Sequence, residues 1–281
     1  MRYTEYMLGV FDSGIGGLNV LRDIRQKLPN SSIMYLGDGA RTPYGNRSRE
    51  VVTKYTKECC SLLFEKGCNL IVLACNTASA ETLRELQKKW LPSIRKSLGR
   101  EVNILGVIFP LAEEAVQQTK NKRIGVVGTR STIESETYVK ELKKLNPEVE
   151  VIQKACPLLV PLVEEGWQKK PESRKILRTY LSSIKSANPD VLILGCTHYE
   201  GMYPLFSQMM GRQCNVLHTP SIVADKLVEY LKRHPEYEIK ETGETHFMTT
   251  GDPERFSEMG SRFFGSEIQG AKKVDVVPIC M

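Results

Sequence analysis

Two of the eight cysteines stand at equivalent places in the chain, each at the end of an apolar run of strand length. Cys75 follows residues 70–74 and Cys196 follows residues 191–195, and small polar residues come after each. Backbone N–H groups at the start of a helix stabilise a thiolate. Because a free thiol has a pKa of about 8.5, a modest downward shift makes it a base at neutral pH. We therefore interpret Cys75 and Cys196 as acid/base groups. The other six cysteines are interpreted as core residues: Cys59, Cys60, Cys68, Cys156, Cys214 and Cys280.

Polar groups that could assist these thiols lie close by in the sequence. His198, two residues after Cys196, can share a proton with the thiol and tune it. Asp12 ends the first apolar run and precedes the glycines of the segment 13–17. Asp12 could bind an ammonium group, assist a thiol or form an Asx turn. The glycines allow a phosphate loop, but the spacing matches neither common phosphate-binding motif.

Two further segments carry weaker signals. Residues 41–46 form a turn by composition, and the hydroxyl group of Tyr44 with nearby backbone N–H groups could hold a carboxylate. Glu164 and Glu165 follow an apolar segment that begins at Cys156. Taken alone, these segments are typical of a surface turn and of the solvated end of a helix.

The elements that must position these residues are short apolar runs that alternate with amphipathic segments. The runs are continuously apolar, which is typical of parallel strands covered by helices on both faces. We therefore predict a doubly wound α/β fold. Capping patterns place helix starts at Ser131, with the helix continuing to Leu145, and at Thr219-Pro220. Strands are expected at Tyr6–Phe11, Ile33–Leu36, Leu70–Ala74, Ile104–Ile108, Arg123–Val127, Val149–Ile152, Val191–Leu194 and Asn215–Leu217.

The chain repeats one pattern in its two halves: a strand, a polar turn, then a second strand tipped by cysteine. In open α/β sheets, ligands bind beyond the carboxyl ends of the strands. Two similar domains that face each other would bring Cys75 and Cys196 to one cleft.

Composition narrows the class of protein. A length of 281 residues fits two α/β domains, and the net charge of +6 is spread thinly over both halves. No dense basic stripe predicts nucleic-acid binding, and no apolar run is long enough to span a membrane. The N-terminus leads directly into a strand without a signal-peptide pattern, so we expect a cytoplasmic protein. The scattered cysteines predict neither disulfides nor zinc.

Six segments together resemble the glutamate racemase family over essentially the whole chain: FDSGIGGL, PYGNRS, ACNTAS, GVVGTRSTI, CPLLVPLVEEG and GCTH. The resemblance implies two flavodoxin-like domains: residues 1–107 with 218–281 carrying Cys75, and residues 108–217 carrying Cys196. It implies interconversion of L- and D-glutamate without cofactor or metal, which supplies D-glutamate for peptidoglycan. The small-molecule substrate is the expected partner, and a homodimer is left open.

The resemblance also assigns roles to individual residues. Cys75 and Cys196 are implied to be the two acid/base groups, and Asp12 and His198 are implied to assist them. Glu164 is implied to be an auxiliary carboxylate near the second cysteine. The implied substrate-binding positions are Asp12, Ser13, Tyr44, Gly45, Asn76, Thr77, Thr129, Thr132, Thr197 and His198.

One departure from the family pattern follows the second cysteine. Four extra residues, Glu200–Tyr203, separate Tyr199 from Pro204 and are expected to lengthen a loop or shift the next helix start. Two other functions remain open: an aspartate racemase with the same cysteine pair, and a phosphate- or nucleotide-binding module that uses Asp12–Gly17.

Overall fold

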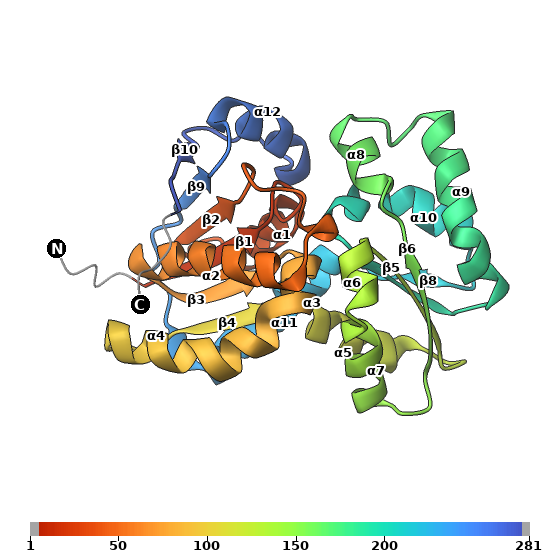
Figure 1. The fold of residues 1–281 in the computed structure, drawn as a ribbon, viewed down its shortest axis with the longest axis horizontal. Coiled ribbons are helices and arrows are strands. Elements are labelled where there is room, and N and C mark those ends of the chain that lie inside the picture. The colour runs from red at the N-terminus through yellow and green to blue at the C-terminus, as the bar shows by residue number, and fades with distance from the viewer. Residues whose placement is uncertain (1–5, 277–281) are drawn as a thin grey trace.

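The strands form two separate parallel sheets. The computed structural model describes residues 6–276, so Cys280 lies outside the described residues. The first sheet has the order β10-β9-β2-β1-β3-β4 and the second β6-β5-β7-β8, and the two lie side by side (Figure 1). The first contains β1 (Met7–Asp12), β2 (Ile33–Gly37), β3 (Cys68–Leu73), β4 (Asn103–Gly106), β9 (Thr245–Thr249) and β10 (Lys272–Lys273). The second contains β5 (Arg123–Gly128), β6 (Glu150–Ala155), β7 (Val191–Gly195) and β8 (Asn215–Val216).

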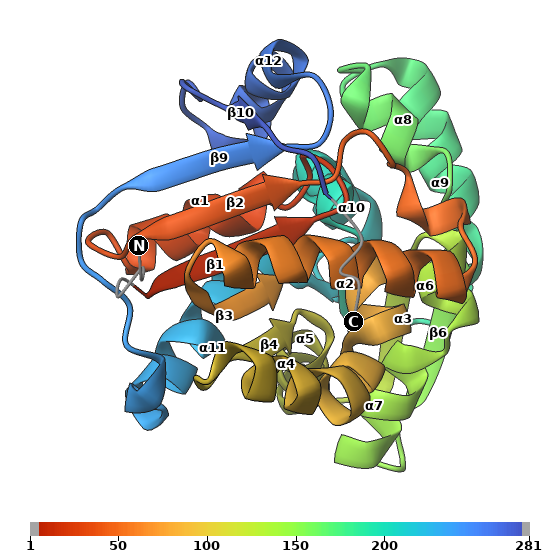
Figure 2. The ribbon, with the colours of Figure 1, turned by 60° about the vertical axis from the view of Figure 1, so that its left-hand side comes forward.

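Helices cover both faces of the first sheet, as the continuously apolar strands require. Leu8 and Val10 of β1 pack into one cluster with α1 and α11, whereas Phe11 packs into another with α2, α3 and α4. Figure 2 shows α2 crossing one side of the strands, with α1 on the other. The α/β prediction is thus confirmed. The helices around this sheet are α1 (Leu18–Lys27), α2 (Arg49–Glu65), α3 (Asn76–Glu85), α4 (Leu91–Leu98), α11 (Thr219–Arg233) and α12 (Pro253–Phe264).

The second sheet is built from one continuous stretch of chain, whereas the first takes strands from before and after it. The domain boundaries at 107/108 and 217/218 stay a prediction. The helices of the second part are α5 (Ile108–Gln118), α6 (Arg130–Glu134), α7 (Thr137–Leu145), α8 (Leu159–Glu164), α9 (Pro171–Ser186) and α10 (Tyr203–Met210). Shorter turns are η1 (Tyr44–Asn46), the π-turn η2 (Leu86–Trp90), η3 (Thr197–Met202) and η4 (Pro235–Tyr237).

Two predicted helix starts were wrong. The expected helix from Ser131 to Leu145 is two helices, because Glu136 adopts the left-handed conformation at φ 54° and interrupts the backbone. Its first part is capped by Thr129, whose side chain accepts from the N–H of Thr132. The cap of α11 is His218 rather than Thr219, since the His218 ring accepts from the N–H of Ser221.

The described elements differ from the prediction in two further places. Strands β9 and β10 were not predicted, although β9 pairs with β2 over its whole length. The four extra residues Glu200–Tyr203 do not form an open loop. They continue the η3 turn and begin α10.

Candidate active site

The two cysteines named from the sequence line one small cavity between the sheets. Cys75 lies just beyond β3, and its side chain caps α3. Cys196 lies directly after β7 at the N-cap position of η3, without a side-chain cap hydrogen bond. The cavity has a volume of about 30 Å³, and its lining includes most of the predicted site residues. Those on its wall are Ser13, Tyr44, Gly45, Cys75, Asn76, Thr77, Thr129, Cys196, Thr197 and His198. Asp12, Thr132 and Glu164 do not line the cavity, but each contacts a residue that does, while Thr42, Pro43 and Val160 line it without having been predicted.

Cys75 is held by two short-range contacts. Its thiol donates to Oγ of Ser13 at 3.4 Å, and its Sγ accepts from the N–H of Ala78 at 3.5 Å. Burial raises the pKa of Cys75, the nearby carboxylate of Asp12 also raises it, and the two hydrogen bonds only partly offset this, so that the resulting pKa is about 12. The expected downward shift was therefore wrong for Cys75, because a helix start alone does not outweigh burial beside a negative charge. Cys75 is a thiol at neutral pH.

Cys196 has a different neighbour, the imidazole of His198. Burial lowers the pKa of His198, but its hydrogen bonds to Cys196 and Glu164 outweigh burial and raise the pKa to about 10. Nε2 of His198 lies 3.0 Å from Oε1 of Glu164. Burial raises the pKa of Glu164, but His198 outweighs it and leaves that pKa below the ordinary value. The structure thus brings together the side chains of Cys196, His198 and Glu164, and Glu164 rather than Glu165 is the partner of His198.

Asp12 joins the two halves of the site. It is fully buried, and burial raises its pKa. One carboxylate oxygen accepts from the N–H of Gly14 at 2.9 Å, and the other accepts from the Thr197 hydroxyl at 3.3 Å. Asp12 acts on Cys75 through its charge, and its side-chain hydrogen bond crosses to the turn that carries Cys196.

Three threonine hydroxyls form a second link across the cavity. The Oγ1 atoms of Thr77 and Thr129 lie 3.0 Å apart, those of Thr77 and Thr132 lie 3.3 Å apart, and those of Thr129 and Thr132 lie 2.9 Å apart. Thr77 is on α3, whereas Thr129 and Thr132 belong to the start of α6. The predicted residue Thr132 therefore orients the other two hydroxyls without lining the cavity itself.

The side-chain amide of Asn76 has a donor, Nδ2, without a hydrogen-bond partner among residues 6–276. Its Oδ1 accepts from the Tyr138 hydroxyl at 2.6 Å, while Nδ2 is buried. Buried polar atoms are almost always paired, so an unpaired amide on a cavity wall indicates a place for a ligand acceptor.

Tyr44 does not offer its hydroxyl to the cavity. That hydroxyl donates to Oδ2 of Asp38, which also binds Nε of Arg41 at 2.7 Å. The expectation that the Tyr44 hydroxyl holds a carboxylate was wrong, because Asp38 already occupies it. The Tyr44–Gly45 backbone still lines the cavity, and Gly45 is packed so tightly that an added Cβ would lie 2.7 Å from Cβ of Thr129.

A larger groove adjoins the cavity and shares part of its wall. It has a volume of about 850 Å³, and Thr42, Pro43, Gly45, Thr129 and Val160 line both spaces. Arg47, Arg130, Glu134 and Glu164 also line this groove. The groove thus lies directly beside the cavity that Cys75 and Cys196 line.

The space beside Gly16, in the glycine segment after β1, is occupied by side chains of the protein. A Cβ on Gly16 would lie 2.6 Å from Nδ1 of His198, so this turn packs directly against the second cysteine's segment. No group of three or more metal-ligating side chains occurs within the described range 6–276. None of the helices in that range is long and apolar enough to cross a membrane.

Two parallel sheets each bring a cysteine to one shared cavity, an arrangement that fits an α/β racemase. A family model described as Asp/Glu/Hydantoin racemase matches residues 17–227. The chain belongs to this family, and within it to the glutamate racemases, as curated relatives of that name show.

The similarity extends over nearly the whole chain. A glutamate racemase of Geobacter metallireducens is 38% identical over 270 residues, which cover 96% of either chain. The solved structure of isoform RacE1 from Bacillus anthracis has a TM-score of 0.88 and 32% identity, covering 98% of this chain and 99% of that one. A glutamate racemase from Francisella tularensis in complex with D-glutamate has a TM-score of 0.85 and 29% identity, covering 97% and 98%.

Proposed function

We propose that this chain interconverts L- and D-glutamate by proton transfer at the α-carbon, with Cys75 and Cys196 as the two acid/base groups, and that the D-glutamate enters peptidoglycan. The observation that carries the proposal is the placement of both cysteines, one from each sheet, on one cavity wall. The substrate identity is supported by relatives named for glutamate and by a similar structure that binds D-glutamate.

The two cysteines start in different protonation states. Burial beside Asp12 keeps the proton on Cys75, so the two-base reaction needs Cys196, the neighbour of His198, as the base. The Cys196 thiolate removes the α-proton from one face of the substrate, and the Cys75 thiol donates a proton to the opposite face. The product leaves with the two protonation states exchanged, and the reverse reaction uses the opposite starting state.

The α-proton beside a carboxylate is a very weak acid, so the site must stabilise the carbanion that develops. Preorganised donors do this best where water is excluded. The free Nδ2 of Asn76 and the hydroxyl of Thr77 belong to residues that line the cavity and can bind the substrate carboxylate. Thr197 also lines the cavity, but its hydroxyl donates to Asp12. The auxiliary roles of Asp12, His198 and Glu164 follow from their charges beside the two thiols.

Substrate binding requires the two sheets to separate. Glutamate has ten non-hydrogen atoms, whereas the cavity of about 30 Å³ has room for one water molecule. The adjoining groove leads to this cavity. The described conformation is therefore a closed one, and opening of the cleft admits glutamate.

The test is racemisation of L- and D-glutamate by purified protein in heavy water, with Cys75→Ser and Cys196→Ser as variants. Each variant should lose about 100-fold or more of the rate, because a serine hydroxyl is far less acidic than a thiol. Cys214→Ser is the control, since this buried cysteine lies outside the cavity. Wild-type product should carry deuterium at the α-carbon. Full activity in either active-site variant, or product without deuterium, would refute the two-base mechanism.

Aspartate is the alternative substrate, because the same cysteine pair could act on it. Parallel assays with both amino acids separate the two functions. Nucleotide binding is disfavoured by the packing of Gly16 against His198, and a titration with nucleotides should show no binding.

A further inference from the structure

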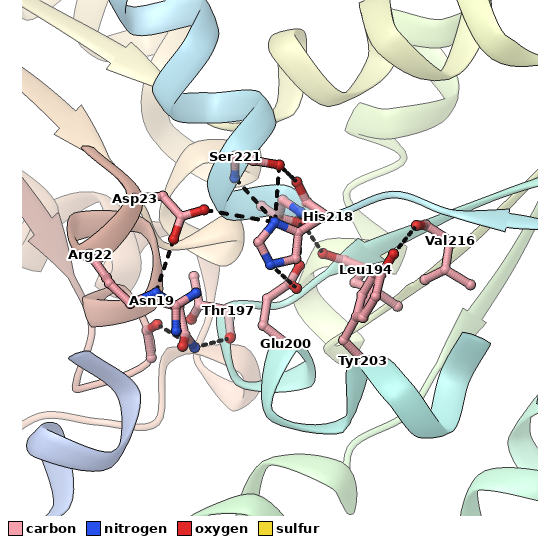
Figure 3. A network of polar contacts seen from close by, with 12 residues as sticks. Asn19, Arg22, Asp23, Leu194, Thr197, Glu200, Tyr203, Val216, His218 and Ser221 are labelled. Atoms are coloured by element: carbon pink, nitrogen blue, oxygen red, sulfur yellow. Dashed lines mark hydrogen bonds and ion pairs between the residues drawn. The ribbon is translucent and has the colours of Figure 1, made fainter. Parts of the chain in front are cut away.

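The turn that carries Cys196 is anchored from outside the cavity by helices of the first sheet. Nδ2 of Asn19, on α1, donates to the carbonyl oxygen of Thr197 at 3.2 Å and to that of Gly16 at 3.3 Å. Oε1 of Glu200, the last polar side chain of η3, accepts from the N–H of Thr219 at 3.0 Å. Figure 3 shows these contacts together at the point where the chain returns to α11.

The burial of the Glu200 carboxylate costs free energy of folding. Only 9% of it is exposed, and its second oxygen, Oε2, has no hydrogen-bond partner in the described part of the chain. Burial and, to a smaller extent, Asp23 raise its pKa and outweigh the hydrogen bonds from Thr219, so that the resulting pKa is about 7. A buried carboxylate with an unpaired oxygen opposes folding, so stability alone does not account for a glutamate here.

The surroundings of Glu200 indicate what the carboxylate does. Asp23 and Arg22 of α1 form an ion pair at 3.0 Å, and Asp23 also lies 3.8 Å from Nδ1 of His218. The N–H of Ser221 donates to that Nδ1, so the neutral ring carries its proton on Nε2. Nε2 lies 3.9 Å from Oε2 of Glu200. One oxygen thus binds the first turn of α11, and the other faces a donor that a small movement would bring into contact.

The two anchors of the Cys196 turn, the contact between Asn19 and Thr197 and the contact between Glu200 and Thr219, connect parts of the chain that belong to different sheets. Cys196 and Glu200 belong to the turn after β7 of the second sheet, whereas α1 and α11 pack together on the first sheet. Opening of the cleft must loosen at least one of these contacts, and closing must restore it.

We propose that Glu200 is a positioning residue: through Thr219 and the start of α11, it sets the place of the Cys196 turn each time the two sheets close. This inference rests on the proposed two-base function. Glu200 lies within the four residues that interrupt the family pattern, so this chain supplies its own anchor for the turn.

The experiment compares Glu200→Met, which keeps the length but removes the acceptor, with Glu200→Gln, which keeps an oxygen for the N–H of Thr219. Glu200→Met should lower kcat by roughly 100-fold with little change in KM, because a displacement of about 1 Å at a reacting group costs that much. Glu200→Gln should retain most of the activity. The control is Glu229→Gln, an exposed glutamate of α11 that pairs only with Lys226 among the charged groups of the described chain.

Solvent exchange distinguishes a positioning role from a general structural one. When one cysteine is impaired, the enantiomer whose α-proton faces the other cysteine still exchanges that proton for deuterium without inversion. The variants Cys196→Ser and Cys75→Ser should each retain exchange in one enantiomer only, and the enantiomer that still exchanges should differ between the two variants. Glu200→Met should show the pattern of Cys196→Ser, because it displaces that cysteine and leaves Cys75 in place.

The outcomes separate this inference from the proposed function. Equal loss of exchange in both enantiomers, or unchanged kcat in Glu200→Met, would overturn the positioning role while wild-type racemisation stands. If wild-type protein does not racemise glutamate, the proposed function itself fails. Should Glu200→Met melt below the assay temperature, Asn19→Leu removes the second anchor and should give the same one-sided exchange pattern. Symmetric exchange there would equally refute the role of the anchors.

Discussion

Replacing Gly16 with alanine should push the Cys196 turn away from the cavity without straining the backbone of residue 16. An added Cβ would lie 2.6 Å from Nδ1 and 2.9 Å from Cε1 of His198, and closer still to Oγ1 of Thr197. Neither side chain is free to turn aside, since Thr197 binds Asp12 and His198 binds Glu164. Gly16 is outside the left-handed conformation, so alanine can adopt its backbone.

The expected magnitude follows from these distances. Ordinary van der Waals contact with a Cβ begins at 3.4 Å. The turn must therefore shift by about 1 Å, and a misplacement of that size costs roughly 100-fold in rate. Overpacking of this kind also lowers the free energy of unfolding by about 1–3 kcal/mol.

The assay is kcat/KM for both enantiomers by chiral separation, together with thermal unfolding. Gly14→Ala is the matched control, because it adds the same methyl group to the same loop with its nearest neighbour, Oγ1 of Thr42, at 3.5 Å. Both substitutions reduce the conformational entropy of the unfolded chain equally. The difference in kcat/KM and in thermal stability between the two variants therefore reports the contact with the Cys196 turn. If Gly16→Ala and Gly14→Ala have the same kcat/KM, the closed packing of the two halves is not required for catalysis and the reasoning fails.

Two further predictions concern the wall of the cavity. Tyr138→Phe leaves Oδ1 of Asn76 unpaired, so the free energy of unfolding should fall by about 1–3 kcal/mol and KM for glutamate should rise. The control is Tyr230→Phe, which should leave KM unchanged because the Tyr230 hydroxyl lies away from the cavity. Asp12→Asn removes a negative charge that raises the pKa of Cys75, so alkylation of this thiol, followed by mass spectrometry, should begin at lower pH than in wild type. A pKa of Cys75 that stays the same or rises in Asp12→Asn would contradict the electrostatic account.

The sequence predicted the sheets well because their strands are continuously apolar. All eight predicted strands overlap β1 to β8, and both cysteines stand where strand ends were expected. Strand β9 escaped prediction because it begins with the polar residues Thr245 and His246, and β10 is only an exposed pair of lysines at the sheet edge. The break at Glu136 also left no signal, since a left-handed conformation outside glycine depends on tertiary packing.

The chemistry of the site was less predictable than its location. The Tyr44 hydroxyl and the Cys75 thiol were assigned from their residue types, but their behaviour depends on neighbours. Asp38 occupies the hydroxyl, and burial beside Asp12 raises the pKa of the thiol. Asn19 carried no signal at all, because its contact with Thr197 joins residues 178 positions apart. Motifs identify which residues reach a site, whereas charge and hydrogen bonding there follow from the fold.

The two cysteines have unlike surroundings, although their substrates are mirror images of equal free energy in water. Cys75 stands beside the carboxylate of Asp12 and Cys196 beside the His198 ring, and burial together with Asp12 keeps the proton on Cys75 in the free protein. Because the equilibrium constant of racemisation is one, kcat/KM must be equal in the two directions whatever the site's asymmetry. The asymmetry can therefore appear only as matched differences in kcat and KM. Under the two-base proposal, the direction in which Cys75 donates the proton starts with this residue already protonated. The reverse direction must first move a proton from Cys75 to Cys196, and opening of the cleft between turnovers gives water the access to do so.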